Sequence, residues 1–160
     1  MAKLIIIRGN SGSGKTVLAK KLQEHYGTEQ CLLLHQDVLR REILHASDKA
    51  GTPAIPMIKT LIDFGREYYP ITIIEGILRR DVYGPMLEDE CKNFGDQAYV
   101  YYLDISFFKT VQHNNMKDKP FSEDLLKKWW LDYDVLSNHD IVFKQGNVED
   151  FCNKIIDQIK

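Results

Sequence analysis

Few folds accommodate the run Gly9–Thr16 (GNSGSGKT), which fits the pattern G-x-x-x-x-G-K-[S/T]. The apolar run Leu4–Ile7 comes directly before it and predicts a strand. From Lys15 to Tyr26 apolar residues recur at helical spacing, and Gly27 follows as a helix stop. The sequence therefore predicts a strand, a glycine-rich turn and a helix in immediate succession.

This turn has the composition of a phosphate-binding loop. Glycines let backbone N–H groups curl around phosphate oxygens without Cβ clashes, and the following helix adds the positive end of its dipole. In such a loop Lys15 reaches the β- and γ-phosphates of a nucleotide, and the Thr16 hydroxyl binds Mg²⁺. An ordinary glycine-rich turn is the alternative, but the complete pattern with both flanks favours nucleotide binding. The expected nucleotide-binding residues are Gly9, Asn10, Ser11, Gly12, Ser13, Gly14, Lys15 and Thr16.

Strands and helices alternate along the rest of the chain. The strand candidates are nearly continuous apolar runs, which is typical of a parallel sheet covered on both faces. They are Leu32–Leu34, Ile71–Ile74, Tyr99–Leu103 and Ile141–Phe143, and the helix candidates are Val38–Ala46, Ala54–Tyr69, Asp81–Phe94 and Val148–Ile159. This alternation predicts a doubly wound α/β fold. No composition shift or linker marks a boundary, so we expect one domain over 1–160.

Composition argues against several classes of partner. The net charge of −2 gives no electrostatic reason to expect a nucleic acid or an anionic membrane. The apolar runs are too short to span a bilayer, and the N-terminus lacks the features of a signal peptide. The three cysteines, Cys31, Cys91 and Cys152, have no metal-site spacing and read as reduced thiols. We therefore expect a cytoplasmic protein with no membrane partner, as a monomer or a homodimer.

The segment after the second predicted strand carries a candidate for acid–base chemistry. Ligands bind at the carboxyl ends of parallel strands, so Asp37 is expected on the same edge of the sheet as the glycine-rich loop. A carboxylate there can accept a proton from an attacking hydroxyl. Arg40 lies three residues later, on the same face of a helix, where it could bind a phosphate or an acidic acceptor. The alternative is that Asp37 caps the next helix and Arg40 is its surface partner.

Further candidates follow the third and fourth predicted strands. Glu75 ends the third strand at the position where an acid often binds Mg²⁺; it could instead contact the acceptor or be a solvated carboxylate. Gly76 would let a ligand approach the backbone there. Of the next two arginines, we expect Arg79 to be the one that binds substrate. Asp104 is expected to cap the helix after the fourth strand.

Three segments together resemble small P-loop kinases: GNSGSGKT, HQDVLRRE after the second strand, and IIEGIL at the third. The families in question include chloramphenicol phosphotransferase, the zeta-toxin kinases, gluconate kinase and the 5′-kinase domain of polynucleotide kinases. The resemblance implies a P-loop NTPase three-layer α/β sandwich with a parallel five-stranded sheet of order 2-3-1-4-5. It also implies that Asp37 deprotonates the acceptor hydroxyl, that Arg40 contacts the substrate, and that a helical lid spans about 106–130.

The lid candidate departs from the pattern of such kinases, which usually supply arginines from the lid to the transferred phosphoryl group. The segment Ser106–Trp130 contains no arginine, and its cations are Lys109, Lys117, Lys119, Lys127 and Lys128. A lysine is a point charge rather than a bidentate fork, so charge stabilisation would be weaker or would come from elsewhere. Trp129 and Trp130 are expected to pack the lid helix, and His113 is the histidine nearest to this chemistry.

The residues favour a kinase that transfers the γ-phosphoryl group of ATP, with Mg²⁺, to a hydroxyl of a small molecule. Two alternatives remain. One is a polynucleotide 5′-hydroxyl kinase, against which the acidic balance argues without excluding it. The other is a nucleotide-dependent switch or binding module without an acceptor. The sequence identifies neither the acceptor nor the preference for ATP over GTP.

Overall fold

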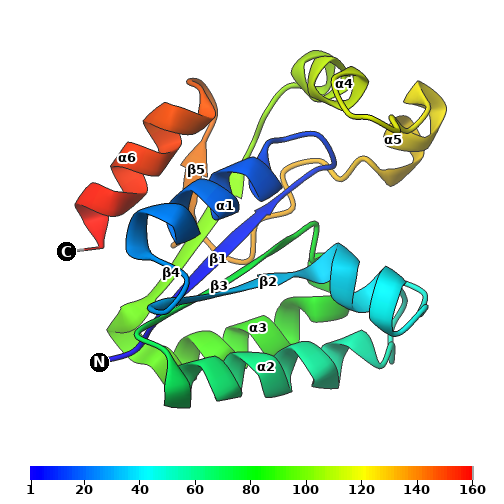
Figure 1. The fold of residues 1–160 in the computed structure, drawn as a ribbon. Coiled ribbons are helices and arrows are strands. Elements are labelled where there is room, and N and C mark those ends of the chain that lie inside the picture. The colour runs from blue at the N-terminus through cyan, green and yellow to red at the C-terminus, as the bar shows by residue number, and fades with distance from the viewer. Residues whose placement is uncertain (160) are drawn as a thin grey trace.

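A five-stranded parallel sheet lies between two layers of helices (Figure 1). The computed structural model describes residues 1–159. The strands are β1 (Lys3–Gly9), β2 (Cys31–His35), β3 (Ile71–Gly76), β4 (Ala98–Leu103) and β5 (Ile141–Phe143), in the order β2-β3-β1-β4-β5. The helices are α1 (Lys15–Tyr26), η1 (Val38–Ile43), α2 (Ala54–Tyr68), α3 (Arg80–Phe94), η2 (Gly95–Gln97), α4 (Phe107–Asn115), α5 (Glu123–Trp129) and α6 (Val148–Gln158). The expected fold class and strand order are confirmed.

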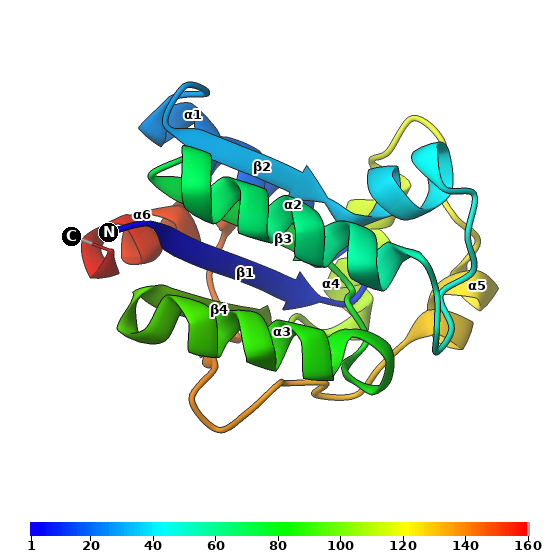
Figure 2. The ribbon, with the colours of Figure 1, turned by 90° about the horizontal axis from the view of Figure 1, so that it is seen from below.

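All strands run in one direction, so their carboxyl ends meet at one edge of the sheet. In Figure 2 the arrowheads of β1 and β2 point toward the side where α4 and α5 lie, and both chain ends lie at the opposite side. Pairing in register places His35 of β2 opposite Glu75 of β3. The segments that follow the strands are therefore neighbours in space although they are far apart in the sequence.

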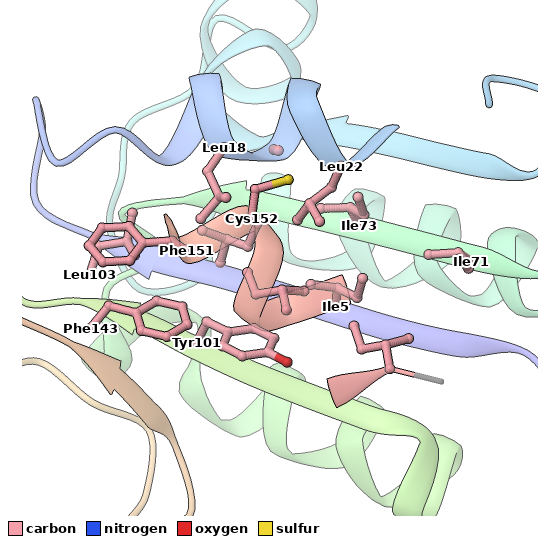
Figure 3. Packing of buried hydrophobic residues seen from close by; sticks show 14 of the residues in the cluster. Ile5, Leu18, Leu22, Ile71, Ile73, Tyr101, Leu103, Phe143, Phe151 and Cys152 are labelled. Atoms are coloured by element: carbon pink, nitrogen blue, oxygen red, sulfur yellow. The ribbon is translucent and has the colours of Figure 1, made fainter. Parts of the chain in front are cut away.

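Each face of the sheet has its own apolar core, which explains why the strand sequences are continuously apolar. On one face Ile5 and Ile7 of β1 pack with α1 and α6 (Figure 3). There the rings of Phe143 and Phe151 stack with centroids 4.7 Å apart. On the other face Leu4 and Ile6 pack against α2 and α3. Alternate residues of β1 thus enter opposite cores.

Two expectations about helices are wrong. The regular helix expected over Val38–Ala46 is a short π-helix that ends at Ile43, where the Leu44 amide donates to the carbonyl of Leu39, five residues back. The chain leaves the helix after this widened turn, and His45 adopts a positive φ of 50°. Asp104 does not cap the helix after β4. Its own amide donates to Phe143 of β5, and Ser106 caps α4 instead, accepting from the amide of Lys109.

The cysteines are free thiols, as expected, within the described part of the chain. Burial raises the pKa of Cys31 to about 12, so this thiol stays protonated at neutral pH. Among residues 1–159, no helix combines the length and the apolar character needed to cross a bilayer.

Candidate active site

The loop between β1 and α1 has the conformation that its sequence predicts. Gly12 and Gly14 have φ values of 80° and 98°, a region that side chains other than glycine rarely adopt. Gly14 precedes α1 without a side-chain cap, so the first amides of the helix face the loop. Lys15 folds back over the loop, and its Nζ donates to the carbonyl of Asn10 at 2.8 Å. The loop is a preformed site for an anion.

Lys15 is buried, and this burial lowers the pKa of its ammonium group. The carboxylates of Glu75 and Asp37 act in the opposite direction, and the charge of Lys117 lowers the pKa further. A desolvated ammonium that is only partly compensated gains free energy when a polyphosphate joins it. The electrostatics therefore favour an anionic ligand at the loop.

Glu75 lies beside Thr16 at the end of β3. The Thr16 hydroxyl donates to Glu75 Oε1 at 3.1 Å, and His35 Nδ1 lies 2.8 Å from the same oxygen. A hydroxyl and a carboxylate are the oxygen ligands that Mg²⁺ prefers, and Glu75 is a largely buried carboxylate at the wall of the cleft. These two residues fit a magnesium ion. The sequence did not indicate that His35 orients the carboxylate, because that contact depends on the pairing of β2 with β3.

One cleft of about 340 Å³ joins the loop to the expected acid–base residue. The motif residues that line it are Ser11, Gly12, Gly14, Lys15 and Thr16, and Asp37, Glu75 and Gly76 line it from the neighbouring strand ends. Asp37 is 62% exposed and makes no cap hydrogen bond to η1, so its carboxylate is available to a ligand. Gly9, Asn10 and Ser13 are buried and do not line the cleft.

Arg40 and Arg79 do not line this cleft. The Arg40 guanidinium donates to the carbonyl of Ala46 at 3.0 Å and lies 3.8 Å from Asp48 and 3.9 Å from Asp37. Arg79 pairs with Asp81 through two hydrogen bonds of 2.9 and 3.1 Å. Both arginines have internal partners, and their expected role as substrate ligands has no support in this geometry.

The lid segment closes over the loop from one side. His113 Nδ1 of α4 lies 2.6 Å from the carbonyl oxygen of Gly12. At the far end of the lid, the Asn10 side chain donates to the carbonyl of Leu131 at 2.7 Å and accepts from its amide at 2.8 Å. The motif residue Asn10 thus binds the lid connection instead of pointing into the cleft. Met116, Lys117 and Phe121 of the lid line the cleft.

The tryptophans of the lid pack against other rings, as expected. Trp129 lies edge-on to Phe121 and Trp130 edge-on to Phe107, with centroids 4.9 and 5.4 Å apart. Arg41 of η1 lies over Phe121 and Trp129, 5.7 and 5.6 Å from the ring centroids. No local sequence pattern indicates this contact, which joins the segment after β2 to the lid.

A second cavity, of about 350 Å³, adjoins the other side of the loop. Ser13 lines it from the loop, Lys109 and His113 from the lid, and Asn147 and Val148 from the start of α6. His113 and Val148 also line the cleft. The two spaces therefore share a wall beside the phosphate loop.

Arg8 lies directly before the loop, and no sequence pattern marked it as a residue of the site. Its guanidinium is buried, donates to the carbonyl of Leu78 at 2.8 Å and pairs with Asp134 at 2.9 Å. It also donates to the backbone carbonyl of Asp134, and it lies over the ring of Tyr102. Burial lowers its pKa, while Asp134 and Asp140 raise it. Arg8 joins β1, the connection after β3 and the connection after the lid.

Known proteins resemble this chain in structure, whereas the sequence comparisons find no match. No protein-family model and no curated protein matches the chain. The gluconokinase of Sinorhizobium meliloti 1021 is similar with a TM-score of 0.69 and 12% identity, over 98% of this chain and 91% of that chain. The APS kinase of Mycobacterium tuberculosis, in complex with AMPPNP and APS, has a TM-score of 0.70 and 14% identity, over 98% of this chain and 96% of that chain. The tunicamycin resistance protein of Deinococcus radiodurans has a TM-score of 0.66 and 15% identity, over 99% of this chain and 96% of that chain.

Similarity at this level of identity concerns the fold. The sheet order and the helices on both faces of the sheet match a P-loop NTPase α/β fold. The resemblance inferred from the three sequence segments is confirmed in structure, and gluconokinase is among the proteins that share it.

Proposed function

We propose that this protein is an ATP-dependent phosphotransferase that moves the γ-phosphoryl group of ATP·Mg²⁺ to a hydroxyl group of a small molecule. The observation that carries the proposal is the single cleft in which Lys15 and Thr16 lie together with the carboxylate of Asp37. A phosphate loop alone also serves hydrolases and switches. A free carboxylate across the same space is what transfer to a hydroxyl requires. The structural similarity to several kinases supports this choice.

The chain's own residues supply most of the nucleotide site. The loop amides and the Lys15 ammonium bind the terminal phosphates, and Thr16 and Glu75 hold Mg²⁺. When bound, Mg²⁺ adds positive charge to the phosphate oxygens. Lys117 lines the cleft from the lid and is close enough to Lys15 to affect its pKa, so we assign to it the charge that lid arginines supply elsewhere.

The chemical step follows from the position of Asp37. The acceptor hydroxyl oxygen forms a bond to the γ-phosphorus, and the bond between this phosphorus and the oxygen of the β-phosphate breaks. Asp37 takes the hydroxyl proton, and ADP leaves with the electron pair of the broken bond. Asp37 Oδ1 lies 3.9 Å from the guanidinium groups of both Arg40 and Arg41.

The second cavity is the place we propose for the base, because it adjoins the phosphate loop on the side away from Asp37. Lys109 and Asn147 line it and offer polar groups to the ring edge. The compartment that we propose is the cytoplasm, where ATP is available and free thiols stay reduced.

Transfer of radiolabelled γ-phosphate to a panel of small hydroxyl compounds tests the proposal. Replacing Asp37 by asparagine keeps the shape but removes the proton acceptor, so transfer should fall by about 10²–10⁴-fold with nucleotide affinity nearly unchanged. Lys15→Met should instead abolish nucleotide binding. Asp81→Asn is the matched control, since Asp81 is exposed, paired with Arg79 and outside the cleft.

Three results would contradict the proposal. Wild-type turnover in the Asp37→Asn protein would remove Asp37 from the chemistry. ATP hydrolysis without transfer to any acceptor, with a partner retained in one nucleotide state, would indicate a switch. Transfer to an oligonucleotide 5′-hydroxyl, with affinity that falls steeply with salt, would indicate a polynucleotide kinase.

A further inference from the structure

We propose that Arg41 is a positioning residue that joins the lid to Asp37, so that the carboxylate of the proposed base is fully oriented only when the lid is seated over the phosphate loop. The inference rests on the proposed function and concerns the same cleft. It is carried by the contacts of Arg41 with two rings of the lid on one side and with Asp37 on the other.

The side chain of Asp37 depends on its neighbours for its orientation. It is 62% exposed and makes no cap hydrogen bond to η1. The guanidinium groups of Arg40 and Arg41 approach the same carboxylate oxygen, Oδ1, each at 3.9 Å. Within residues 1–159 no hydrogen bond engages the other oxygen, Oδ2. Oδ2 is therefore the atom that we expect to take the proton of the acceptor hydroxyl.

The two arginines differ in what holds them. Arg40 is 13% exposed and donates to the carbonyl of Ala46 at 3.0 Å, so its position is set within its own segment. The Arg41 side chain is 43% exposed and makes no hydrogen bond within the described chain. Its guanidinium lies instead over Phe121 and Trp129 of the lid, 5.7 and 5.6 Å from the ring centroids. The position of Arg41 therefore depends on the lid, whereas that of Arg40 does not.

The ring of Phe121 is built firmly into the lid. The side chain of Asn114 accepts from the backbone amide of Phe121 at 3.0 Å and donates to its carbonyl at 2.7 Å. Asn114 belongs to α4 and is buried, and Trp129 lies edge-on to Phe121 with centroids 4.9 Å apart. Phe121 also lines the cleft. The ring surface that holds Arg41 is thus fixed to the lid by its backbone as well as by its packing.

The same ring contacts the cation that we assign to the phosphates. Lys117 Nζ lies 5.3 Å from the Phe121 centroid, and both residues line the cleft. The face of an aromatic ring is the negative part of its quadrupole and attracts cations. One lid residue thereby contacts both Lys117 and Arg41. When the lid is seated, it places one charge near the phosphate loop and the other beside Asp37.

This arrangement makes the base effective in the closed site. With the lid displaced, Asp37 keeps Arg40 but loses the contact that fixes Arg41, and its carboxylate is less well oriented. Proton transfer requires the base within hydrogen-bond reach of the hydroxyl, and a displacement of about 1 Å can lower a rate by about 100-fold. The contact therefore favours transfer in the state in which the lid covers the site.

Replacing Arg41 by glutamine removes the charge from a half-exposed side chain, so the variant should fold. Turnover is measured with the best acceptor of the hydroxyl panel, or with water as ATP hydrolysis where no acceptor is better. The kcat should fall by about 10- to 100-fold, while the affinity for AMPPNP·Mg²⁺ stays nearly unchanged. Arg66→Gln is the matched control and should leave kcat unchanged, since Arg66 lies over Phe94 at 5.8 Å and does not line the cleft.

A role exercised through Asp37 has a signature that a merely structural role lacks. In the Asp37→Asn protein there is no base to position, so Arg41→Gln should cause almost no further loss of kcat. Phe121→Leu removes one of the rings under Arg41. It should lower kcat by itself and make a subsequent Arg41→Gln less harmful, because both changes affect one contact. Independent losses that multiply in either pair of variants would overturn the inference.

Tryptophan fluorescence reports the contact between Arg41 and the lid. The chain has two tryptophans: Trp129 ends α5, and Trp130 follows it. Because the guanidinium of Arg41 lies over Trp129, Arg41→Gln should shift the tryptophan emission, whereas Arg66→Gln should not. An unchanged emission in an Arg41→Gln protein that melts like the wild type would show that Arg41 does not contact the lid, and the inference would be wrong.

The outcomes separate this inference from the proposed function. Slow turnover of Asp37→Asn together with wild-type kcat in Arg41→Gln keeps the phosphotransferase and rejects the positioning role. An Arg41→Gln protein with a higher KM for the acceptor and an unchanged kcat also rejects it, because Arg41 would then bind the acceptor instead of orienting the base. Wild-type turnover of Asp37→Asn, or no turnover of ATP by the unmodified protein, rejects both.

Discussion

Arg8 is a charged residue in β1, the central strand of the sheet, where it follows the apolar run Leu4–Ile7. Its guanidinium is fully buried and has partners in two connections, at Leu78 and Asp134. The amide of Arg80 donates to the same Asp134 carboxylate at 3.0 Å. Because Arg8 precedes Gly9 in β1, this network fixes the strand end that carries the phosphate loop.

Replacing Arg8 by methionine should lower the free energy of unfolding by about 3 kcal/mol, because Asp134 and the Leu78 carbonyl lose their partner while remaining largely buried. Urea unfolding followed by circular dichroism measures the change. The double variant Arg8→Met/Asp134→Asn should lose less than the sum of the single variants, since the two side chains interact. Additive losses would show that the pair is not coupled.

Glu90 of α3 is buried against α2. Its Oε1 lies 2.9 Å from Lys59 Nζ, and Asp63 Oδ2 lies 3.0 Å from the same nitrogen. Burial raises the pKa of the Glu90 carboxyl, and the neighbouring Asp63 raises it further, while Lys59 lowers it. The folded state therefore holds a proton on Glu90 at a pH where the unfolded chain has released it.

This difference predicts a pH dependence of stability. Between the unfolded and the raised folded pKa the native state binds more protons, so stability falls as pH rises through this range and is recovered as pH falls. Glu90→Gln should flatten this slope at pH values above the ordinary pKa of a glutamate side chain, because the amide cannot ionise. Urea midpoints measured across that range test it. A slope unchanged in the variant would assign the dependence to other groups.

At the scale of elements, the contact of α4 with the phosphate loop positions the lid. A Cβ at residue 12 would lie 2.5 Å from the carbonyl oxygen of Thr110, and His113 binds the Gly12 carbonyl. Glycine at position 12 is therefore favoured for two reasons, the positive backbone φ and the close approach of α4.

Gly12→Ala separates these origins when it is compared with Gly51→Ala. The two glycines have φ values of 80° and 79°, but nothing lies within 4 Å of a Cβ built at Gly51. Gly51→Ala should cost about 1–2 kcal/mol of stability through backbone conformation alone and leave ATP affinity unchanged. Gly12→Ala should cost more and weaken ATP binding, measured by calorimetry. Equal effects of the two variants on binding would show that the contact with α4 is unimportant.

The elements whose structure was predicted correctly are those with a strong local signal. The helix from Lys15 to Tyr26 was predicted with its observed bounds, because the glycine-rich loop and Gly27 mark its ends. The segment after β2 was mistaken for a regular helix, because Val38–Ala46 has no local mark of a π-helix. The chain that follows the π-helix is held by tertiary bonds, among them those of Asp48 with Tyr83 at 2.6 Å and with Gln36 at 3.4 Å.

At the scale of the whole molecule, parallel strands bring distant residues to one edge. Lys15 and Asp37 are expected there from the sequence, since each follows a predicted strand closely, and both line the cleft. The magnesium pair of Thr16 and Glu75 also lies there, at 3.1 Å. What the sequence could not indicate is which arginines enter the cleft. Arg40 and Arg79 lie near strand ends too, but their partners Ala46, Asp48 and Asp81 hold them elsewhere.

The amino-acid sequence alone determined the phosphate loop, the alternation of strands and helices and the residue most suited to accept a proton, because each depends on residues adjacent in the chain. The tertiary structure alone decided which lid cation lines the cleft together with Lys15 and which arginines are internally paired. Those properties depend on contacts between segments up to 126 residues apart, such as that of Arg8 with Asp134. No local pattern records such contacts, because they form only when the sheet and the lid are assembled.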